Sequence, residues 1–238
     1  MEITLEFTKS LEANASLYYE IAKKYKGKRE RALAALQRLK KVTPKTAQVA
    51  VKKLWYHAYR WFRSSTGVLC VGGRNAASNE SLVKNHMLPD ETVMHTTLAG
   101  SPFVVIKGKP DETTLHECAL ATAAWSRAWK QQLKTATIMI VKRSQLKKKG
   151  PKGESLPKGS FYVAGSHDEQ LVPVGCTIGM IDGIAVCGPE AAIKKHATVA
   201  ITLTQGTKSK EIIAPTLARA IGCNVDDVLR ALPAGEFA

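Results

Sequence analysis

A helix-breaking step at Thr43-Pro44 divides the chain into two stretches of different character. From about Ser10 up to this step, apolar residues recur at three- and four-residue spacings, which predicts one apolar stripe along a helix. The residue before a proline is displaced from the helical region, so the helix is expected to end here. From Trp55 onward, aromatic side chains are crowded together and mark the start of a globular part. We therefore expect a helical arm over residues 1–54, followed by a globular body.

The predicted arm is basic and has little core of its own. Its apolar stripe comprises Leu11, Ala15, Tyr18, Ala22, Tyr25, Ala32, Leu33, Leu36 and Leu39, and its basic flank comprises Lys23, Lys24, Lys26, Lys28, Arg29 and Arg31. A short strand is expected over 2–7 and a second short helix over 45–54. A stripe of this kind needs a partner, so we expect a coiled-coil-like arm that packs as a hairpin, against another protein or in a homodimer.

The body mixes strands and helices without a regular alternation. Thr66-Gly67 predicts the turn of a hairpin between strands at 59–63 and 68–71. Further strands are expected at 92–96, 103–107, 137–142, 160–164, 176–181, 184–187 and 197–204, and helices at 75–87, 113–134, 209–221 and 225–231. This order favours an α+β fold, with a mixed sheet and packed helices, over a doubly wound sheet. No apolar run is long enough to predict a membrane-spanning helix.

Positive charge is concentrated in two segments. The chain has 35 Lys and Arg against 20 Asp and Glu, a formal net charge of +15. Residues 1–63 carry 15 basic and 5 acidic residues, and residues 142–158 carry 7 and 1, while the remaining segments are nearly neutral. This distribution indicates a polyanionic partner, the alternative being a solvated basic surface.

Two features could contact phosphates. Gly72-Gly73-Arg74 follows a predicted strand and precedes a helix, which would leave backbone N–H groups free to cradle a phosphate; the alternative is a plain tight turn. A glycine- and proline-punctuated basic loop follows at 142–158, and the alternative there is a solvated loop. Aromatic rings could stack on bases, although most are expected in the core; the candidates are Trp55, Trp61, Phe62, Trp125 and Trp129.

The sequence gives no positive signal for a metal site, a cofactor or a catalytic mechanism. The six histidines form no metal-binding pair, and no nucleophile motif is present. The five cysteines include no CxxC pair, which predicts free thiols in a reducing cytoplasm rather than a disulfide framework. The competing hypothesis is an RNA-modifying or RNA-processing enzyme. It would need His95, Asn79 and Glu80 to converge with Arg74.

The segment from Trp55 to Glu80 resembles the opening of the RNA-binding (NFACT-R) domain of the NFACT family, as found in ribosome-associated quality-control factors. It reads WYHAYRWFRSSTGVLCVGGRNAASNE. The similarity continues through Ser126-Arg127-Ala128-Trp129 and Leu156-Pro157-Lys158-Gly159-Ser160-Phe161, so it covers roughly residues 55–165. Residues 5–54 resemble a shortened form of the preceding coiled coil, and the tail at 232–235 resembles the C-terminal extension of archaeal members.

The resemblance implies an RNA-binding module that acts with tRNA or the large ribosomal subunit. Full-length relatives bind a large subunit that carries a stalled nascent chain and recruit tRNA, but their large N-terminal domain has no counterpart in this sequence. Three motifs depart from the family pattern: Asn75 replaces an acidic residue, Thr96-Thr97 follows His95, and Ala99 precedes Gly100. These departures argue against a shared catalytic or small-molecule role.

We therefore expect a cytoplasmic, non-enzymatic RNA-binding protein that works in translation or ribosome quality control. Its expected domains are the arm at 1–54, an NFACT-R-like domain at 55–165 and a C-terminal α+β extension at 166–238 packed on it. The residues expected to contact RNA are Arg60, Arg63, Gly72, Gly73, Arg74, Asn79, Lys142, Arg143, Lys147, Lys148, Lys149, Lys152 and Lys158. A dimeric structural adaptor built on the arm is a further alternative.

Overall fold

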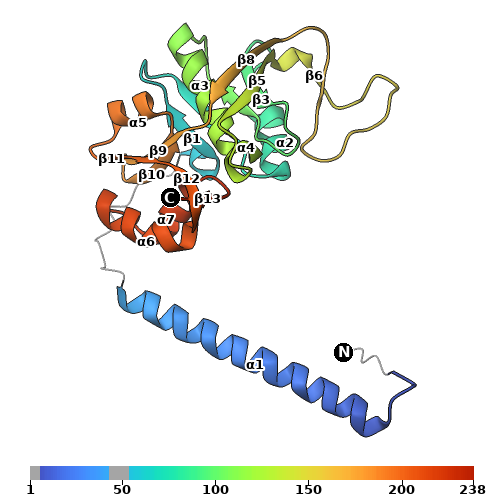
Figure 1. The fold of residues 1–238 in the computed structure, drawn as a ribbon. Coiled ribbons are helices and arrows are strands. Elements are labelled where there is room, and N and C mark those ends of the chain that lie inside the picture. The colour runs from blue at the N-terminus through green and yellow to red at the C-terminus, as the bar shows by residue number, and fades with distance from the viewer. Residues whose placement is uncertain (1–5, 43–53) are drawn as a thin grey trace. The chain divides into compact units, whose positions relative to one another are not determined.

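The computed structural model describes residues 6–42 and 54–238. The chain divides into two compact units, Met1–Lys45 and Thr46–Ala238 (Figure 1). We call them the arm unit and the body and describe each by itself. Within the described residues, no helix has the length and apolar character that crossing a membrane requires.

The arm unit is one long helix, α1 (Leu11–Val42). Its first turn is capped by Ser10, whose Oγ accepts a hydrogen bond from the backbone N–H of Ala13 at 3.2 Å. The helix continues through Gly27, as the apolar stripe predicts. The expected strand at 2–7 lies mostly outside the described residues, and Phe7 belongs to a turn; the expected helix at 45–54 also falls almost wholly outside them.

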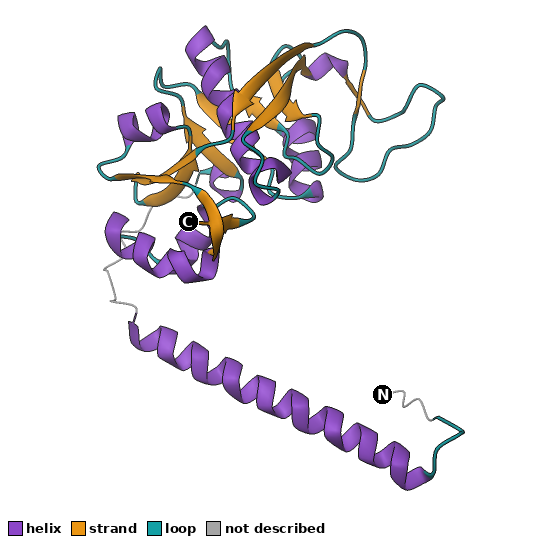
Figure 2. Cartoon of the chain, in the orientation of Figure 1, coloured by secondary structure: helices purple, strands orange, loops and turns teal. Residues whose placement is uncertain are grey.

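A six-stranded antiparallel sheet forms the centre of the body (Figure 2). Its strand order is β1 (Arg60–Arg63), β2 (Leu69–Gly72), β4 (Val104–Ile106), β3 (Thr92–Thr96), β5 (Thr135–Lys142) and β8 (Asp168–Pro173). The helices in this part of the chain are η1 (Trp55–Ala58), α2 (Ala76–Asn85), α3 (Glu112–Trp125), α4 (Arg127–Lys130) and η2 (Arg143–Gln145). The predicted hairpin at 59–71 and helix at 75–87 are both present, and Asn75 caps α2 by accepting from the Ser78 N–H at 2.9 Å.

The rest of the chain adds smaller sheets and three helices. The second sheet has the order β10 (Ile184–Gly188), β9 (Cys176–Ile181) and β11 (Ala200–Leu203). Two short ladders are formed by β12 (Gln205–Ser209) with β13 (Glu236–Phe237) and by β6 (Leu146–Lys147) with β7 (Tyr162–Val163). The helices are α5 (Glu190–His196), α6 (Lys210–Ile221) and α7 (Val225–Ala231). The predicted α+β class is confirmed.

The helix predicted over 113–134 is wrong as one element, because it is interrupted at Ser126. The backbone of Ser126 is extended, with φ −81° and ψ −179°. Its hydroxyl donates to the carbonyl of Ala123 at 2.7 Å and accepts from the N–H of Ala128 at 3.0 Å, so one side chain ends α3 and starts α4. Trp125 and Trp129 therefore belong to two helices and not to one face of a single helix.

The prediction of free thiols is wrong for one pair of cysteines. The antiparallel pairing of β9 and β10 brings the Cα atoms of Cys176 and Cys187 to 6.4 Å, within the span of a disulfide, and the structure joins the two residues. Cys70 and Cys118 are buried free thiols, and Cys223 is a half-buried one. The contact depends on a strand register that cysteine spacing alone does not reveal.

Residues after 165 are built into the body. Strand β8 pairs with β5 along Thr135–Ile140, which makes it the edge of the central sheet. The indole N–H of Trp125 donates to the Cys187 carbonyl at 3.1 Å, and that of Trp129 donates to the Glu236 carbonyl at 3.2 Å. Both indoles are almost fully buried, so these bonds satisfy donors that water does not reach.

Candidate nucleic-acid interface

The basic segment predicted at 142–158 forms a long hairpin-like loop, which we call the basic loop (residues 142–163). It leaves β5, passes through η2 and β6, and returns through β7. Its tip turns tightly: the Gly153 N–H donates to the Gly150 carbonyl at 3.0 Å, and the Gly150 N–H to the Glu154 carbonyl at 2.9 Å. Figures 1 and 2 show this loop projecting from the central sheet. It is anchored by the buried side chain of Leu146, which is 3% exposed.

Four lysines of the basic loop are exposed and have no side-chain partner among the described residues. They are Lys147, Lys149, Lys152 and Lys158. Exposed ammonium groups without a partner are available to phosphates, and phosphate binding would release counterions. Their shared location places four exposed lysines on one projecting loop of the body.

Another lysine of the loop, Lys148, has a structural role. Its Nζ donates to Glu80 Oε2 at 3.0 Å, to the Pro157 carbonyl at 2.8 Å and to the Ser160 carbonyl at 3.2 Å. It also lies 5.0 Å from the centre of the Phe161 ring, a cation–π distance. Lys148 therefore ties the outgoing strand of the loop to the returning strand.

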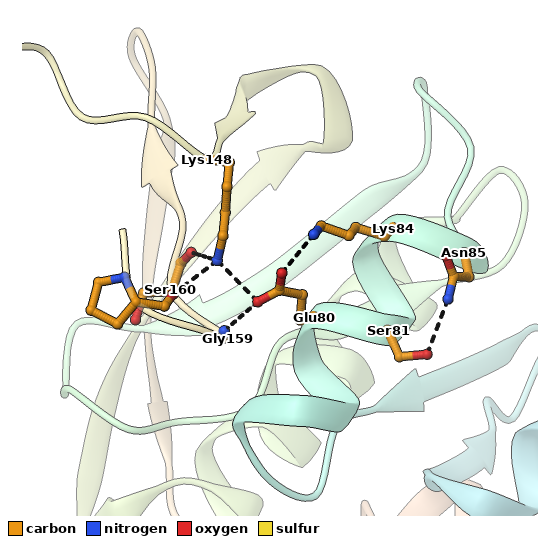
Figure 3. Close-up of polar contacts among 8 residues, drawn as sticks. Glu80, Ser81, Lys84, Asn85, Lys148, Gly159 and Ser160 are labelled. Carbon is orange, nitrogen blue, oxygen red and sulfur yellow. Dashed lines mark hydrogen bonds and ion pairs between the residues drawn. The ribbon is translucent and has the colours of Figure 1, made fainter. Parts of the chain in front are cut away.

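Glu80 on α2 fixes the root of the basic loop (Figure 3). Its carboxylate accepts from Lys148, from the backbone N–H of Gly159 at 2.7 Å and from Lys84 Nζ at 2.6 Å. Gly159 has φ +80°, and a side chain there would collide with the backbone of Ala76. Glycine thus allows the returning strand to approach the first turn of α2 closely enough for Glu80 to hold it.

The same contacts stabilise the charged form of Glu80. Hydrogen bonding from Lys84 is the largest cause, followed by the Gly159 N–H and Lys148, and together they lower the pKa of the carboxyl from 4.5 to about 2. The stabilisation is fully present above the unfolded pKa near 4.5 and is lost as the pH falls from there toward about 2. At neutral pH the carboxylate is charged and holds the loop root.

Replacement of Glu80 by Gln is expected to loosen the loop root. The amide removes the charge that pairs with Lys84 and Lys148, so the Gly159 N–H should exchange with solvent several-fold faster. Hydrogen–deuterium exchange of a peptide covering 148–161 measures this effect. The matched control is Glu190→Gln, because Glu190 also pairs with a lysine four residues later but makes no contact with the loop. Unchanged exchange in the Glu80 variant would contradict the role assigned to its carboxylate.

The glycine turn is occupied by contacts within the protein and is not a free cradle. The N–H of Gly73 donates to the Phe103 carbonyl at 3.1 Å, and those of Arg74 and Asn75 donate to Ser78 Oγ at 2.7 and 2.9 Å. A side chain at Gly72 would collide with the Trp125 ring, and one at Gly73 with the side chain of Asn79. The glycines thus permit close packing, and the N–H groups of Gly73, Arg74 and Asn75 all have acceptors within the protein.

The two predicted phosphate-binding features nevertheless meet. Ala76 opens α2 directly after the glycine turn, and it contacts Gly159 of the basic loop. Asn75 is exposed at this junction. The structure therefore brings the start of α2 against the root of the basic loop.

The arginines predicted to bind RNA are largely committed to backbone carbonyls. Arg60 donates to the carbonyls of Ala231 and Leu232 at 2.8 and 3.1 Å. Arg74 donates to those of Ala58, Arg230 and Tyr59 at 3.2, 2.6 and 2.8 Å. The two guanidinium groups thus bond consecutive carbonyls at the C-terminal end of α7, where cations are favoured.

Burial lowers the pKa of Arg60 to about 10, with a smaller contribution from the nearby charge of Arg74. Burial likewise lowers the pKa of Arg74 to about 10, assisted by Arg230. Both side chains remain charged at neutral pH. Their N–H donors bind the C-terminal end of α7. The sequence did not predict this structural role.

The remaining predicted contact residues have varied roles. Arg63 donates to the hydroxyl of Tyr56 at 3.3 Å. Asn79 is buried and fastens the loop before β4, accepting from the Phe103 N–H at 3.3 Å. Arg143 donates to the Val83 carbonyl at 2.9 Å, while Lys142 is exposed and donates to Thr92 Oγ1 at 3.0 Å.

The four residues of the hypothetical enzymatic site, His95, Asn79, Glu80 and Arg74, contact different parts of the body. His95 Nε2 and Asn79 Nδ2 both approach the carbonyl of Ser101, at 3.1 and 3.4 Å. Burial lowers the pKa of His95, and its ring packs on Phe103 with the centroids 4.5 Å apart. Glu80 is engaged with the basic loop and Arg74 with the end of α7, as described above. His95 and Asn79 thus meet at one carbonyl.

The aromatic candidates for base stacking divide into four buried rings and one exposed ring. Trp61, Phe62, Trp125 and Trp129 are at most 5% exposed and belong to the core. Trp55 is 41% exposed and stacks on His86, with ring centroids 4.3 Å apart. The expectation that most of these rings are core residues is confirmed.

Comparison with known families agrees with this arrangement. Residues 58–165 match the NFACT protein RNA binding domain. The matched segment contains the central strands β1–β5, the glycine turn, Glu80 and the whole of the basic loop. Residues 58–165 of the body are therefore similar to an RNA-binding domain of the NFACT type.

Related proteins extend the similarity beyond the matched domain. The chain is 30% identical over 199 residues to the archaeal Rqc2 homolog aRqcH of Methanocaldococcus jannaschii, an alignment that covers 79% of this chain and 30% of that protein. It is 31% identical over 174 residues to the ribosome quality control complex subunit NEMF of Homo sapiens, covering 66% of this chain and 16% of that one. The chain thus spans less than a third of the length of these relatives.

One solved structure is similar at a lower level. It is the C-terminal part of the fibronectin/fibrinogen-binding protein from Streptococcus suis, at 16% identity and a TM-score of 0.41, covering 56% of this chain and 50% of that one. These values are too low for any conclusion about fold or function.

Proposed function

We propose that this chain is an RNA-binding module of ribosome quality control that grips the phosphate backbone of tRNA or ribosomal RNA through its basic loop. The observation that carries the proposal is the group of exposed lysines on a loop whose root is fixed by Glu80. A fixed root reduces the conformational entropy that the loop must lose on binding. The NFACT-type domain and the ribosome quality control names of the relatives support the same function.

The proposal assigns direct contacts to the exposed loop lysines and to Lys142, and an indirect role to the glycine turn. Gly72, Gly73 and Arg74 shape the start of α2, against which the loop root lies. Within the proposal the chain acts by binding and not by catalysis, in the cytoplasm and together with ribosomes. The commitment of Glu80 and Arg74 to separate structural contacts supports a binding role.

The test replaces Lys147, Lys149, Lys152 and Lys158 together by Gln and measures RNA affinity over a salt titration. Each lost phosphate contact should lower the slope of log K against log[salt] by about 0.7 for a single strand, so the slope should fall by up to about 3. Affinity at low salt is expected to drop at least tenfold.

A matched control replaces four exposed lysines elsewhere on the body: Lys130, Lys134, Lys195 and Lys208. This variant has the same net charge as the loop variant. Equal losses in both variants would mean that the protein attracts RNA through its overall charge, and the basic loop would then be removed from the model.

A second candidate function concerns the arm unit. Helix α1 exposes large apolar side chains, including Leu11 at 72%, Tyr19 at 80% and Tyr25 at 65%. An exposed apolar face on a helix favours pairing with another helix, so we propose a coiled-coil role for the arm, in a homodimer or with a partner. Light scattering of the intact chain against a chain that begins at Leu54 tests the homodimer; a monomer mass for each chain would exclude it.

A further inference from the structure

A cleft of about 510 Å³ lies where the basic loop leaves and rejoins the central sheet. One side is formed by Lys142 and Gln145 at the start of the loop, and the other by residues 166–168 just after it. The cleft is lined by Thr92, Lys109, Pro110, Leu115, Ile140, Val141, Lys142, Gln145, Ser166, His167 and Asp168. The cleft therefore adjoins the root of the basic loop.

The sheet register explains why these side chains meet. Thr92 is paired with Lys142, and Ile140 with Asp168. Residues paired across strands, and residues two apart on one strand, point to the same face of a sheet, so these four side chains share a face. Leu115, at the end of the first turn of α3, also lines the cleft.

The cleft combines an apolar surface with two cations. Pro110, Leu115 and Ile140 supply flat or branched apolar surface. Lys109 is exposed and has no side-chain partner among the described residues. Lys142 uses one of its three donors on Thr92 Oγ1, at 3.0 Å, which leaves two for a ligand.

We propose that this cleft binds one unpaired nucleotide of the bound RNA. Its base would lie against the apolar surface, and an adjoining phosphate would pair with Lys109 and Lys142. The volume fits, because pockets for small molecules span about 300–1,000 Å³. The base must be unpaired, since bases inside a helix are stacked and cannot enter.

One acidic residue, Asp168, also lines the cleft, and its position at the edge is compatible with a nucleotide site. Asp168 is exposed at the edge of the cleft, on the strand opposite Ile140. A carboxylate repels phosphate but accepts a hydrogen bond from an exocyclic amino group of a base. The arrangement therefore orients the nucleotide, with its phosphate toward the lysines and its base edge toward Asp168.

The proposal rests on the proposed RNA-binding function and is tested with two RNA oligonucleotides. One is an ordinary single strand, and the other has the same backbone with abasic positions throughout. The intact protein is expected to bind the ordinary strand about 5- to 10-fold more tightly, as expected for one stacked base. Fluorescence anisotropy at fixed salt measures both affinities.

Two variants assign this difference to the cleft. Leu115→Gln should remove most of the preference for bases while leaving affinity for the abasic strand unchanged. Lys109→Gln, at an exposed position where folding is not at risk, should weaken binding to the ordinary strand and lower the salt slope by about 0.7. The control Lys134→Gln changes an exposed lysine next to the opposite end of β5 and should leave the preference intact.

The outcomes separate the two proposals. Equal affinity of the intact protein for both strands, or a preference that survives in both cleft variants, overturns the cleft proposal and leaves the basic loop in place. Absence of binding to either strand overturns the RNA-binding function itself, and the cleft proposal with it.

Discussion

A chain that begins at Leu54 and ends at Gly165 is expected to lose cooperative folding, although the family match ends at that residue. The truncation removes β8 from the edge of the central sheet and exposes β5. It also removes the carbonyls that accept from Trp125, Trp129 and Arg60. Each buried donor left without a partner costs about 1–3 kcal/mol. The combined loss is comparable with the about 5–15 kcal/mol that stabilises a typical domain.

Thermal unfolding followed by circular dichroism measures this effect. The matched control is the chain from Leu54 to Ala238, which lacks the arm unit but keeps the whole body and should unfold in one cooperative transition. If the truncated chain unfolds as sharply as this control, the extension after Gly165 is dispensable for the fold.

Replacement of Arg60 by Ala is expected to destabilise the body by about 2–4 kcal/mol, because two charge-assisted hydrogen bonds to the end of α7 are lost. The carbonyls of Ala231 and Leu232 also lose their charged donor. Denaturant unfolding measures the loss. The salt slope of RNA binding should stay unchanged, since this guanidinium is used inside the protein.

The control for this substitution is Arg219→Ala, which removes an exposed arginine from α6 and should leave stability nearly unchanged. The opposite result for Arg60, a lower salt slope with full stability, would return this residue to the RNA-binding surface.

Local patterns predicted most of the elements. The hairpin at Thr66-Gly67, the cap at Asn75 and the strands β3, β4, β5, β9 and β10 all follow from turn chemistry and periodicity. Strand β8 escaped prediction because Asp168-Glu169-Gln170 carries no apolar alternation; its pairing with β5 supplies the stability that its own composition lacks. Helix α5 and the ladder of β12 with β13 were missed as well.

The location of the basic loop could be predicted from the distribution of charge along the sequence. The roles of individual residues within it could not, because they depend on long-range contacts. The run Lys147-Lys148-Lys149 indicated an exposed basic loop, and the structure exposes its first and third members. That the middle one is bound by Glu80, 68 positions earlier in the chain, depends on a long-range contact that spacing does not encode. The same holds for Arg60, whose partners lie 171 and 172 positions away. Only the ion pair of Glu80 with Lys84, among the contacts of Glu80, follows from local spacing, since the two residues are four apart on a helix.

The composition of β8 has a consequence for association between copies of the protein. As the last strand of the central sheet, it has no strand partner on its outer side within the described residues. Such an edge invites a strand from a neighbouring molecule and so promotes aggregation. Two carboxylates open this strand and Pro173 closes it, so a foreign strand would meet negative charge at one end and a missing backbone donor at the other. The two carboxylates that concealed β8 in the sequence thus also disfavour association between copies through this edge.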